Sequence, residues 1–191
     1  MGTPHDDIVY GRSALRNLEP WIVPESLTLL NEVLQPDWHI FEWGSGGSTG
    51  YWAKNCASVV SIEHNSEWVQ RTSKQLLSLG LLARKATLLY VRRGKDEAFR
   101  DYADAILSFP DASFDLVFVD GEASSRDQCL VNAMPKIRLG GYLLLDNSDW
   151  LKRDLGPDWT RQDFVARDLK WIGQKGTFNW WTSILQKTSD A

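Results

Sequence analysis

The stretch HIFEWGSGGSTG, residues 39–50, decides the fold. Its first four residues, 39–42, predict a strand, and the glycine and serine run after them opens a helix whose buried face carries Trp52, Ala53 and Cys56. Glycines in such a turn allow left-handed dihedrals and a close approach of the backbone to a ligand at the helix amino terminus. A glycine-rich turn alone is a weak signal, but its place between a strand and a helix favours a ligand-binding role over a purely structural one.

The rest of the chain alternates strand and helix patterns. Further strands are expected at residues 58–63, 86–91, 114–119, 142–145, 170–174 and 180–186. Further helices are expected at residues 65–80, 96–107, 125–139 and 160–169. Alternating units of this kind require parallel strands with right-handed crossovers. The predicted fold class is therefore α/β: a doubly wound, Rossmann-like seven-stranded sheet, mostly parallel, with an antiparallel last strand.

Composition indicates one ordinary globular domain over residues 1–191, because 43% of the residues are hydrophobic and 24% are charged. No run of eighteen apolar residues and no apolar signal-peptide core occur, so we expect no membrane partner and a cytoplasmic location. The net charge of −4 argues against a nucleic-acid partner. A small-molecule partner fits better, and a homo-oligomer stays open.

An acidic residue lies where a nucleoside ribose is usually held in such folds. Glu63 ends the predicted second strand, nineteen residues after Gly44. A carboxylate at that place can accept hydrogen bonds from both ribose hydroxyl groups, although a solvated glutamate at a strand end would look the same. The spacing fits a nicotinamide dinucleotide and S-adenosylmethionine equally well.

Three features favour S-adenosylmethionine. The classical dinucleotide pattern has its third glycine five residues after the first, and this chain has Thr49 there. Glu42, just before the turn, would suit the sulfonium and ammonium charges of S-adenosylmethionine and repel a pyrophosphate. The last strand, NWWTSILQK, follows closely on the strand before it and can insert antiparallel to close the sheet.

Four motifs together resemble the class I S-adenosylmethionine-dependent methyltransferases over roughly residues 38–187. They are IFEWGSGGSTG, VVSIEHN, FDLVFVDG and LGGYLLLDN. The resemblance implies a cofactor-binding core at residues 38–187 and an amino-terminal cap and acceptor segment at residues 1–37. The cofactor-binding residues that it implies are Glu42, Gly44, Ser45, Gly46, Gly47, Ser48, Glu63, His64 and Asp120. Among them Glu42 would lie near the amino group of the cofactor, Glu63 on the ribose and His64 beside the adenine.

The acids that end the later strands are similar to the ligands of metal-dependent O-methyltransferases of the catechol and caffeoyl type. The resemblance implies Mg²⁺ held by Asp120, Asp146 and Asn147, which would ionise an acceptor hydroxyl. One departure stands against it, because that family commonly has a lysine within three residues of the first aspartate and this chain has none there. Without a metal, these acids would contact cofactor or acceptor directly.

The implied function is methyl transfer from S-adenosylmethionine to a small-molecule acceptor, with oxygen as the expected acceptor atom. Because the sulfonium is already an activated donor, catalysis consists mostly of positioning and of removing one proton. Asp120 and Asp146 are the predicted catalytic residues. Three alternatives stay open: an NAD-dependent oxidoreductase on a similar fold, a non-catalytic methyltransferase-like binding module, and an aminopropyl transferase.

Overall fold

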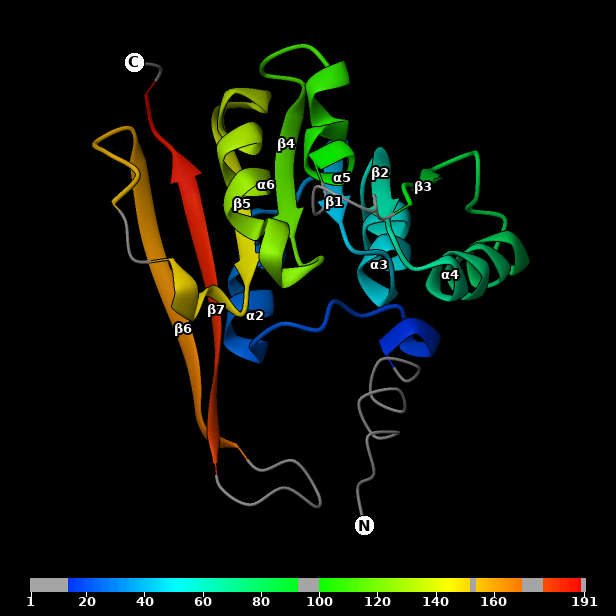
Figure 1. Cartoon of the computed structure of the whole chain (residues 1–191), viewed down its shortest axis with the longest axis horizontal. Helices are drawn as coiled ribbons and strands as arrows, with labels where there is room; N and C mark the ends of the chain where they lie inside the picture. Colours follow the sequence, from blue (N-terminus) through cyan, green and yellow to red (C-terminus); the bar gives the residue numbers. More distant parts are fainter. Residues whose placement is uncertain (1–13, 93–99, 152–153, 170–176, 190–191) are drawn as a thin grey trace.

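A seven-stranded sheet forms the centre of the computed structural model, which describes residues 14–92, 100–151, 154–169 and 177–189 (Figure 1). The strand order is β3-β2-β1-β4-β5-β7-β6. The strands are β1 (His39–Trp43), β2 (Ser58–Glu63), β3 (Ala86–Tyr90), β4 (Phe114–Val119), β5 (Ile137–Asp146), β6 (Trp159–Leu169) and β7 (Phe178–Lys187). Strands β1 to β5 pair in parallel, whereas β7 is antiparallel to both β5 and β6. The predicted fold class is confirmed, including the antiparallel insertion of the last strand.

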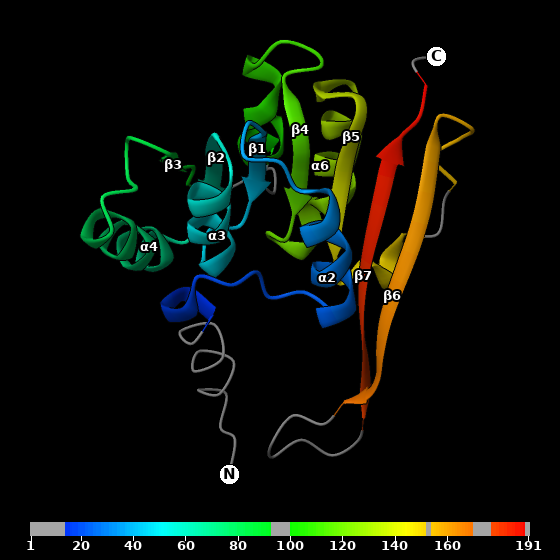
Figure 2. The same cartoon turned by 180° about the vertical axis from the view of Figure 1, so that it is seen from behind.

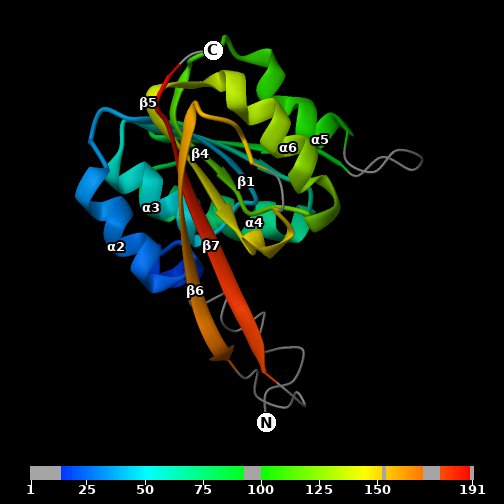
Figure 3. The ribbon, with the colours of Figure 1, turned by 90° about the vertical axis from the view of Figure 1, so that its left-hand side faces the viewer.

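Helices cover both faces of the sheet (Figure 3). The α-helices are α2 (Pro24–Val33), α3 (Gly47–Asn55), α4 (Ser66–Ser78), α5 (Arg100–Asp104) and α6 (Arg126–Ala133). Short 3-10 helices are η1 (Ala105–Ser108), η2 (Ala123–Ser125), η3 (Met134–Lys136) and η4 (Ser148–Trp150). Helices α2, α3 and α4 share one hydrophobic cluster with the sheet, and α5 and α6 share the other. The two-layer cover explains why β4 is buried along its whole length.

Alternation along β1 assigns each of its side chains to one face. Ile40 packs in the cluster that includes α3, while Phe41 and Trp43 pack in the cluster of α5 and α6. Successive side chains of a strand point to opposite faces. Glu42 therefore lies on the face covered by α3, as Ile40 does, and this placement decides its contacts.

The helix expected at residues 160–169 is wrong, because these residues form β6. They pair antiparallel with β7 from Trp159 opposite Lys187 to Leu169 opposite Phe178. The pairing satisfies their backbone with a partner that lies later in the chain, which overrides a weak local helix pattern. The strand expected at residues 170–174 falls outside the described residues.

Two other expected helices are shorter than predicted. Helix α6 ends at Ala133, and β5 begins already at Ile137, which pairs with Phe114 of β4. The long-range pairing thus captures residues that the local pattern assigned to a helix. In the region expected to be helical at residues 96–107, residues 96–99 lie outside the described part, and the rest form α5 and η1.

The β6–β7 hairpin projects past the end of β5. The last pair between β5 and β7 is Asp146 with Thr182, whereas β6 and β7 remain paired as far as Phe178. Figure 1 shows the hairpin extending beyond β5 on the side where the parallel strands end. It therefore stands beside the carboxyl edge of the sheet, where ligands of this architecture bind.

The segment before α2 crosses the same edge. Figure 2 shows it passing beneath α3 on its way to α2. Among the described residues, none of the helices combines the length and the apolar character that crossing a membrane requires.

Candidate functional site

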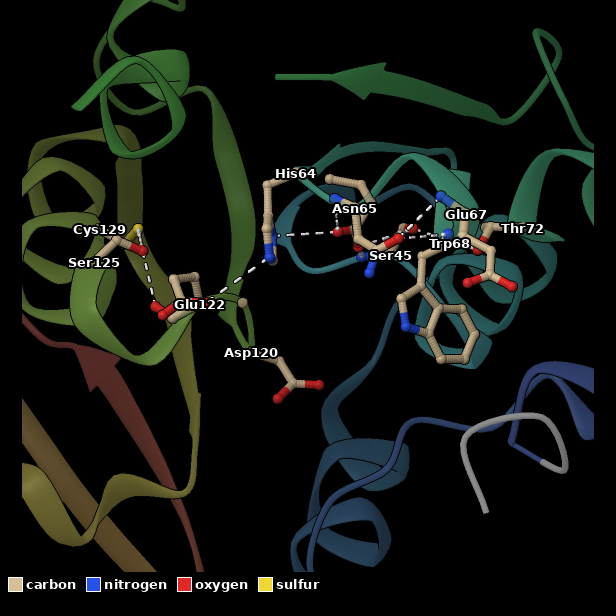
Figure 4. Close-up of polar contacts among 12 residues, drawn as sticks. Ser45, His64, Asn65, Glu67, Trp68, Thr72, Asp120, Glu122, Ser125 and Cys129 are labelled. Carbon is tan, nitrogen blue, oxygen red and sulfur yellow. Dashed lines mark hydrogen bonds and ion pairs between the residues drawn. The ribbon is translucent and has the colours of Figure 1, made fainter. Parts of the chain in front are cut away.

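A cavity of about 440 Å³ opens at the carboxyl ends of β1, β2 and β4. Its volume falls within the range of small-molecule sites. The lining residues are Ala14, Glu19, Trp21, Gly44, Ser45, Gly46, Gly47, Ser48, Glu63, His64, Asn65, Trp68, Asp120, Gly121, Glu122 and Ala123. Eight of the nine predicted cofactor-binding residues are in this set, and Glu42 is the exception. Figure 4 shows part of the wall, with Asp120 projecting from the end of β4 into open space.

The glycine turn brings β1 and β4 close together. Gly44 has a φ of 95°, and a Cβ placed on it would lie 3.0 Å from the carbonyl carbon and oxygen of Asp120. A left-handed residue that touches a neighbouring backbone has to be glycine. Gly46 differs, because a Cβ there would meet nothing within 4 Å. The turn thus uses Gly44 for its own geometry and leaves room for a ligand at Gly46.

The amino-terminal segment packs on the turn from outside. A Cβ on Gly47 would collide with the backbone carbonyls of Ala14 and Glu19. Both residues also line the cavity, together with Trp21. Gly47 thus has a packing role in addition to its place in the wall. Three residues of the segment predicted as a cap, residues 1–37, therefore border the cavity, whereas residues 1–13 fall outside the described part.

Glu63 is held in a fixed orientation at the end of β2. Its carboxylate accepts hydrogen bonds from the backbone N–H of Ser45 at 2.8 Å and of Asn65 at 2.7 Å, and from the Ser45 hydroxyl at 3.2 Å. His64 Nδ1 lies 3.3 Å from the same carboxylate and its Nε2 lies 3.8 Å from Glu122 (Figure 4). Glu63 is only 3% exposed, yet it borders the cavity.

The structure does not bring Glu42 to the cavity. The side chain is fully buried, and its carboxylate accepts hydrogen bonds from Thr49 Oγ1 and, at 3.1 Å, from Trp52 Nε1, both on α3. Thr49 Oγ1 in turn accepts from the backbone N–H of Gly46 at 3.0 Å. Burial raises the pKa of Glu42 to about 7, although these hydrogen bonds lower it. Glu42 therefore stabilises the glycine turn through its hydrogen bonds to α3 and does not line the cavity.

Asp120 and Asp146 end the neighbouring strands β4 and β5. Asp120 borders the cavity with 27% of its side chain exposed, whereas Asp146 and Asn147 are not among the lining residues. Burial of most of its surface and the nearby Asp146 raise the pKa of Asp120 well above its usual range, against the opposing charge of Arg126. The two acids are close enough for each to affect the other.

Asp146 receives donors from the last strand. Trp180 Nε1 donates to Asp146 Oδ1 at 2.9 Å and Thr182 Oγ1 donates to the same oxygen at 3.0 Å. Burial raises the pKa of Asp146 to about 6, while Arg126 and these donors lower it. The Trp180 ring meets Trp21 edge to face with 6.1 Å between centroids. Asp146 is therefore connected to the cavity wall through two tryptophans.

The predicted metal ligands do not fit a divalent ion. Arg126 donates from Nη1 to the Asp146 carbonyl and, at 3.3 Å, to Asn147 Oδ1, and its Nη2 lies 3.5 Å from Asp120 Oδ1. The Asp146 carboxylate instead accepts hydrogen bonds from Trp180 and Thr182. A guanidinium group thus contacts an oxygen atom of each predicted ligand residue, the backbone carbonyl in the case of Asp146, so no reaction step is assigned to a metal.

Sequence reasoning missed several site residues. Arg126, at the start of α6, carries no motif and looks like a solvated helix residue. Trp180 lies in an expected strand, but only the β5–β7 register places it beside Asp146. The sequence around Ala14, Glu19 and Trp21 contains no motif that indicates a binding site. The nearest hint was the number of tryptophans, ten in the chain, which exceeds ordinary usage.

Comparison with known proteins shows the fold. No protein-family model matches the sequence, and no curated protein sequence matches it either. Solved structures do match: an O-methyltransferase from Bacillus cereus in complex with SAH has 16% identity and a TM-score of 0.65, with 98% of this chain and 92% of that chain covered.

Two further structures have the same architecture. An O-methyltransferase from Streptomyces achromogenes in complex with SAM has 18% identity, a TM-score of 0.64 and coverage of 99% and 92%. An rRNA methylase from Streptococcus thermophilus has 16% identity, a TM-score of 0.62 and coverage of 86% and 95%. The chain therefore has the fold of the class I S-adenosylmethionine-dependent methyltransferases.

Proposed function

We propose that the protein binds S-adenosylmethionine in the cavity and transfers its methyl group to an oxygen atom of a small-molecule acceptor. One observation carries the proposal. A single cavity joins the glycine turn after β1, the oriented carboxylate of Glu63 after β2 and the carboxylate of Asp120 after β4. Ligands of open α/β sheets bind at this edge.

The charge of the cavity favours a cationic ligand over a dinucleotide. Its described lining includes four carboxylates, those of Glu19, Glu63, Asp120 and Glu122, and neither lysine nor arginine. The sulfonium and ammonium groups of S-adenosylmethionine suit such a wall, whereas a pyrophosphate would be repelled. The same argument disfavours an NAD-dependent oxidoreductase.

The residues of the turn and of β2 fit the cofactor. The open space at Gly46 leaves room for the methionine part, because no side chain or backbone lies within 4 Å of a Cβ there. Glu63 is oriented by two backbone donors and still faces the cavity, where it can accept from the ribose hydroxyls. His64 and Trp68 border the same end and would flank the adenine.

Asp120 is the proposed proton acceptor. When bound, S-adenosylmethionine supplies a methyl group on a positively charged sulfur. Asp120 would take the proton from the acceptor hydroxyl as the oxygen–methyl bond forms and the sulfur–methyl bond breaks, which leaves the neutral thioether S-adenosylhomocysteine. A carboxylate with a raised pKa is a stronger base than an ordinary aspartate, and a nearby positive charge favours its ionised form. Asp146, at the end of the neighbouring strand β5, raises the pKa of Asp120 further.

The proposed acceptor is a small molecule with a hydroxyl group. Trp21 lines the cavity and contacts Trp180, so the open side next to Asp120 has an aromatic wall. An RNA acceptor is the competing case, since an rRNA methylase is among the structures with this fold. The carboxylates around the cavity and the negative net charge of −4 favour the small molecule, because RNA binding depends on lysine and arginine contacts to phosphates.

A ligand titration tests the cofactor first. S-adenosylhomocysteine at about a hundred times its Kd should raise the melting temperature by about 5–10 °C, since it adds about 2.7 kcal/mol to a chain of this size. NAD⁺ at the same concentration is the matched control and should give no shift. A shift with NAD⁺ alone, or with neither ligand, would contradict the proposal.

Acceptor class is tested second. The protein is incubated with methyl-labelled S-adenosylmethionine and either a panel of catechols, phenols and hydroxy acids or total RNA. We expect label in the small-molecule fraction and none in RNA. Label in RNA alone would replace the small-molecule acceptor while leaving the cofactor assignment intact.

A further inference from the structure

Arg126 is a buried cation at the junction of two strand ends. Its side chain is 8% exposed, although it begins α6 next to solvent-exposed residues. The guanidinium donates from Nε to the Gly121 carbonyl at 3.0 Å and from Nη2 to the Asp120 carbonyl at 3.4 Å. These contacts add to those with the Asp146 carbonyl, Asn147 Oδ1 and Asp120 Oδ1. All of its partners are oxygen atoms.

The partners are the kind of set that a hard cation takes. Magnesium and calcium bind backbone carbonyls, side-chain amide oxygens and carboxylates. Here the same types of oxygen converge from the end of β4 and the end of β5, and a guanidinium supplies the positive charge among them. A planar group with five donors can satisfy several acceptors at once, which a compact ammonium cannot do from the same position.

We infer that Arg126 is a built-in cation that ties the end of β4 to the end of β5 in the place of a divalent metal ion. It acts as a positioning residue, because it fixes Asp120 through both the carbonyl and the carboxylate and does not itself line the cavity. The inference concerns the protein without ligand and stands apart from the proposed function. Its consequences for turnover, that a chelator leaves the rate unchanged, and for S-adenosylhomocysteine binding rest on that function.

The first experiment needs no variant. Melting of the wild-type chain is compared in 5 mM EDTA, in MgCl₂ and in CaCl₂ at matched ionic strength, without cofactor. We expect the three melting temperatures to agree within about 1 °C, since a site already filled by a guanidinium gains nothing from added metal. A rise of about 3 °C or more with either metal, relative to EDTA, would overturn the inference.

The second experiment separates charge from packing. Arg126→Lys keeps a cation, whereas Arg126→Met keeps an apolar stem of similar length. We expect Arg126→Met to melt about 10 °C below the wild type, because it leaves the part-buried Asp120 carboxylate and the carbonyl groups at this junction without their donor, and Arg126→Lys to lose less than half of that. Equal losses in the two variants would show that a positive charge contributes nothing at this junction, and would overturn the cation assignment.

A remote buried cation provides the matched control. Lys136 is 8% exposed and donates to the Phe109 carbonyl at 2.9 Å and to Asp111 at 2.6 Å. Lys136→Met measures the general cost of removing a buried cation from this fold. If S-adenosylhomocysteine binding is then weakened by Arg126→Met and not by Lys136→Met, the effect belongs to the strand junction. If both variants weaken binding equally, Arg126 has no special position and the inference fails.

Discussion

The two sides of the cavity hold their acids in different ways. On the β1–β2 side, defined by residues 44–48 and Glu63, the carboxylate is fixed by the backbone N–H groups of Ser45 and Asn65, which lie in the two adjoining turns. On the β4–β5 side, defined by Asp120 and Asp146, the acids are fixed by side chains from α6 and β7.

The β1–β2 side is held by contacts within adjoining turns, whereas the β4–β5 side is held by contacts between segments far apart in the sequence. Backbone donors come with the turn, so the β1–β2 side forms whenever β1 and β2 pair. The β4–β5 side needs α6 and the hairpin in place first, since Trp180 follows Asp146 by thirty-four residues. We therefore expect the β1–β2 side to respond to substitution mainly through ligand affinity, and the β4–β5 side mainly through stability and pH dependence.

The largest expected effect is on the β1–β2 side. Glu63→Ala removes the acceptor of both ribose hydroxyls and should weaken S-adenosylhomocysteine binding by about 1000-fold, or about 4 kcal/mol, as charge-assisted hydrogen bonds are lost. Isothermal titration calorimetry checks the affinity. Glu67→Ala on α4, an exposed acid paired with Arg71, is the control and should bind normally. A loss of less than tenfold at Glu63 would remove it from the cofactor site.

The next effect tests the contact between the two sides. Gly44→Ala places a Cβ at a left-handed φ and 3.0 Å from the Asp120 backbone, so we expect a loss of about 3–4 kcal/mol in the free energy of unfolding. Gly46→Ala is the control, because a Cβ has open space there; it should keep its stability and lose affinity for S-adenosylhomocysteine. Urea denaturation and calorimetry read the two properties. Equal stability of both variants would refute the close contact.

Replacing Glu42 should change the free energy of unfolding by about 3 kcal/mol in a way that depends on pH. Because burial raises its pKa to about 7 from 4.5, the folded state holds a proton that the unfolded state releases, and wild-type stability falls as pH rises from about 4.5 through about 7. Glu42→Gln cannot lose that proton. The variant should therefore gain about 3 kcal/mol on the wild type between pH 4.5 and pH 8 in urea denaturation.

A pH-independent difference between the Glu42→Gln variant and the wild type would mean that Glu42 has an ordinary pKa. Glu67→Gln serves as the control for a glutamate that lies on the surface, with 69% of its side chain exposed. Its free energy of unfolding at pH 8 should differ from that of the wild type by less than about 1 kcal/mol.

The smallest expected effect is on the β4–β5 side and concerns the hydrogen bond from Trp180 to Asp146. Trp180→Phe removes one of the two side-chain donors that Trp180 and Thr182 supply to Asp146. The loss should raise the pKa of Asp146 further above about 6 and cost about 1 kcal/mol more at pH 8 than at pH 5, because the ionised form depends more on that donor. Trp21→Phe alters the same aromatic pair without touching Asp146 and should show no such pH dependence. The same pH dependence in both variants would assign the effect to packing.

The β1–β2 side was almost fully predictable. The glycine turn and Glu63 lie at one edge, as the spacing predicted, since the carboxyl ends of paired parallel strands must meet there. His64, which only the resemblance implied, lines the same cavity. Glu42 shows the limit of that reasoning. Its position next to the turn predicted a ligand contact, but alternation along β1 turns its side chain towards α3.

The misassigned helix has a related cause. Residues 160–169 mix polar and apolar side chains and carry no strong strand pattern, so their state depends on β7, which follows later in the chain. A strand at the edge of a sheet gains its hydrogen bonds from a partner, and propensity alone cannot supply them. Helix α6 is shorter than predicted for the same reason, because Ile137 pairs with Phe114 of β4 and the helix cannot continue through it.

What the sequence by itself determined is the alternation of strands and helices as far as β5, the antiparallel last strand and the set of acids at the strand ends. Only the tertiary structure decided what lies among those acids: the guanidinium of Arg126, the indole of Trp180 and the backbone of Ala14 and Glu19 against the turn. The physical reason is the range of the contacts. Turns and strand ends follow from neighbouring residues, whereas these contacts join segments whose approach is set by the register of β5 with β7 and by the packing of α6 and the amino-terminal segment.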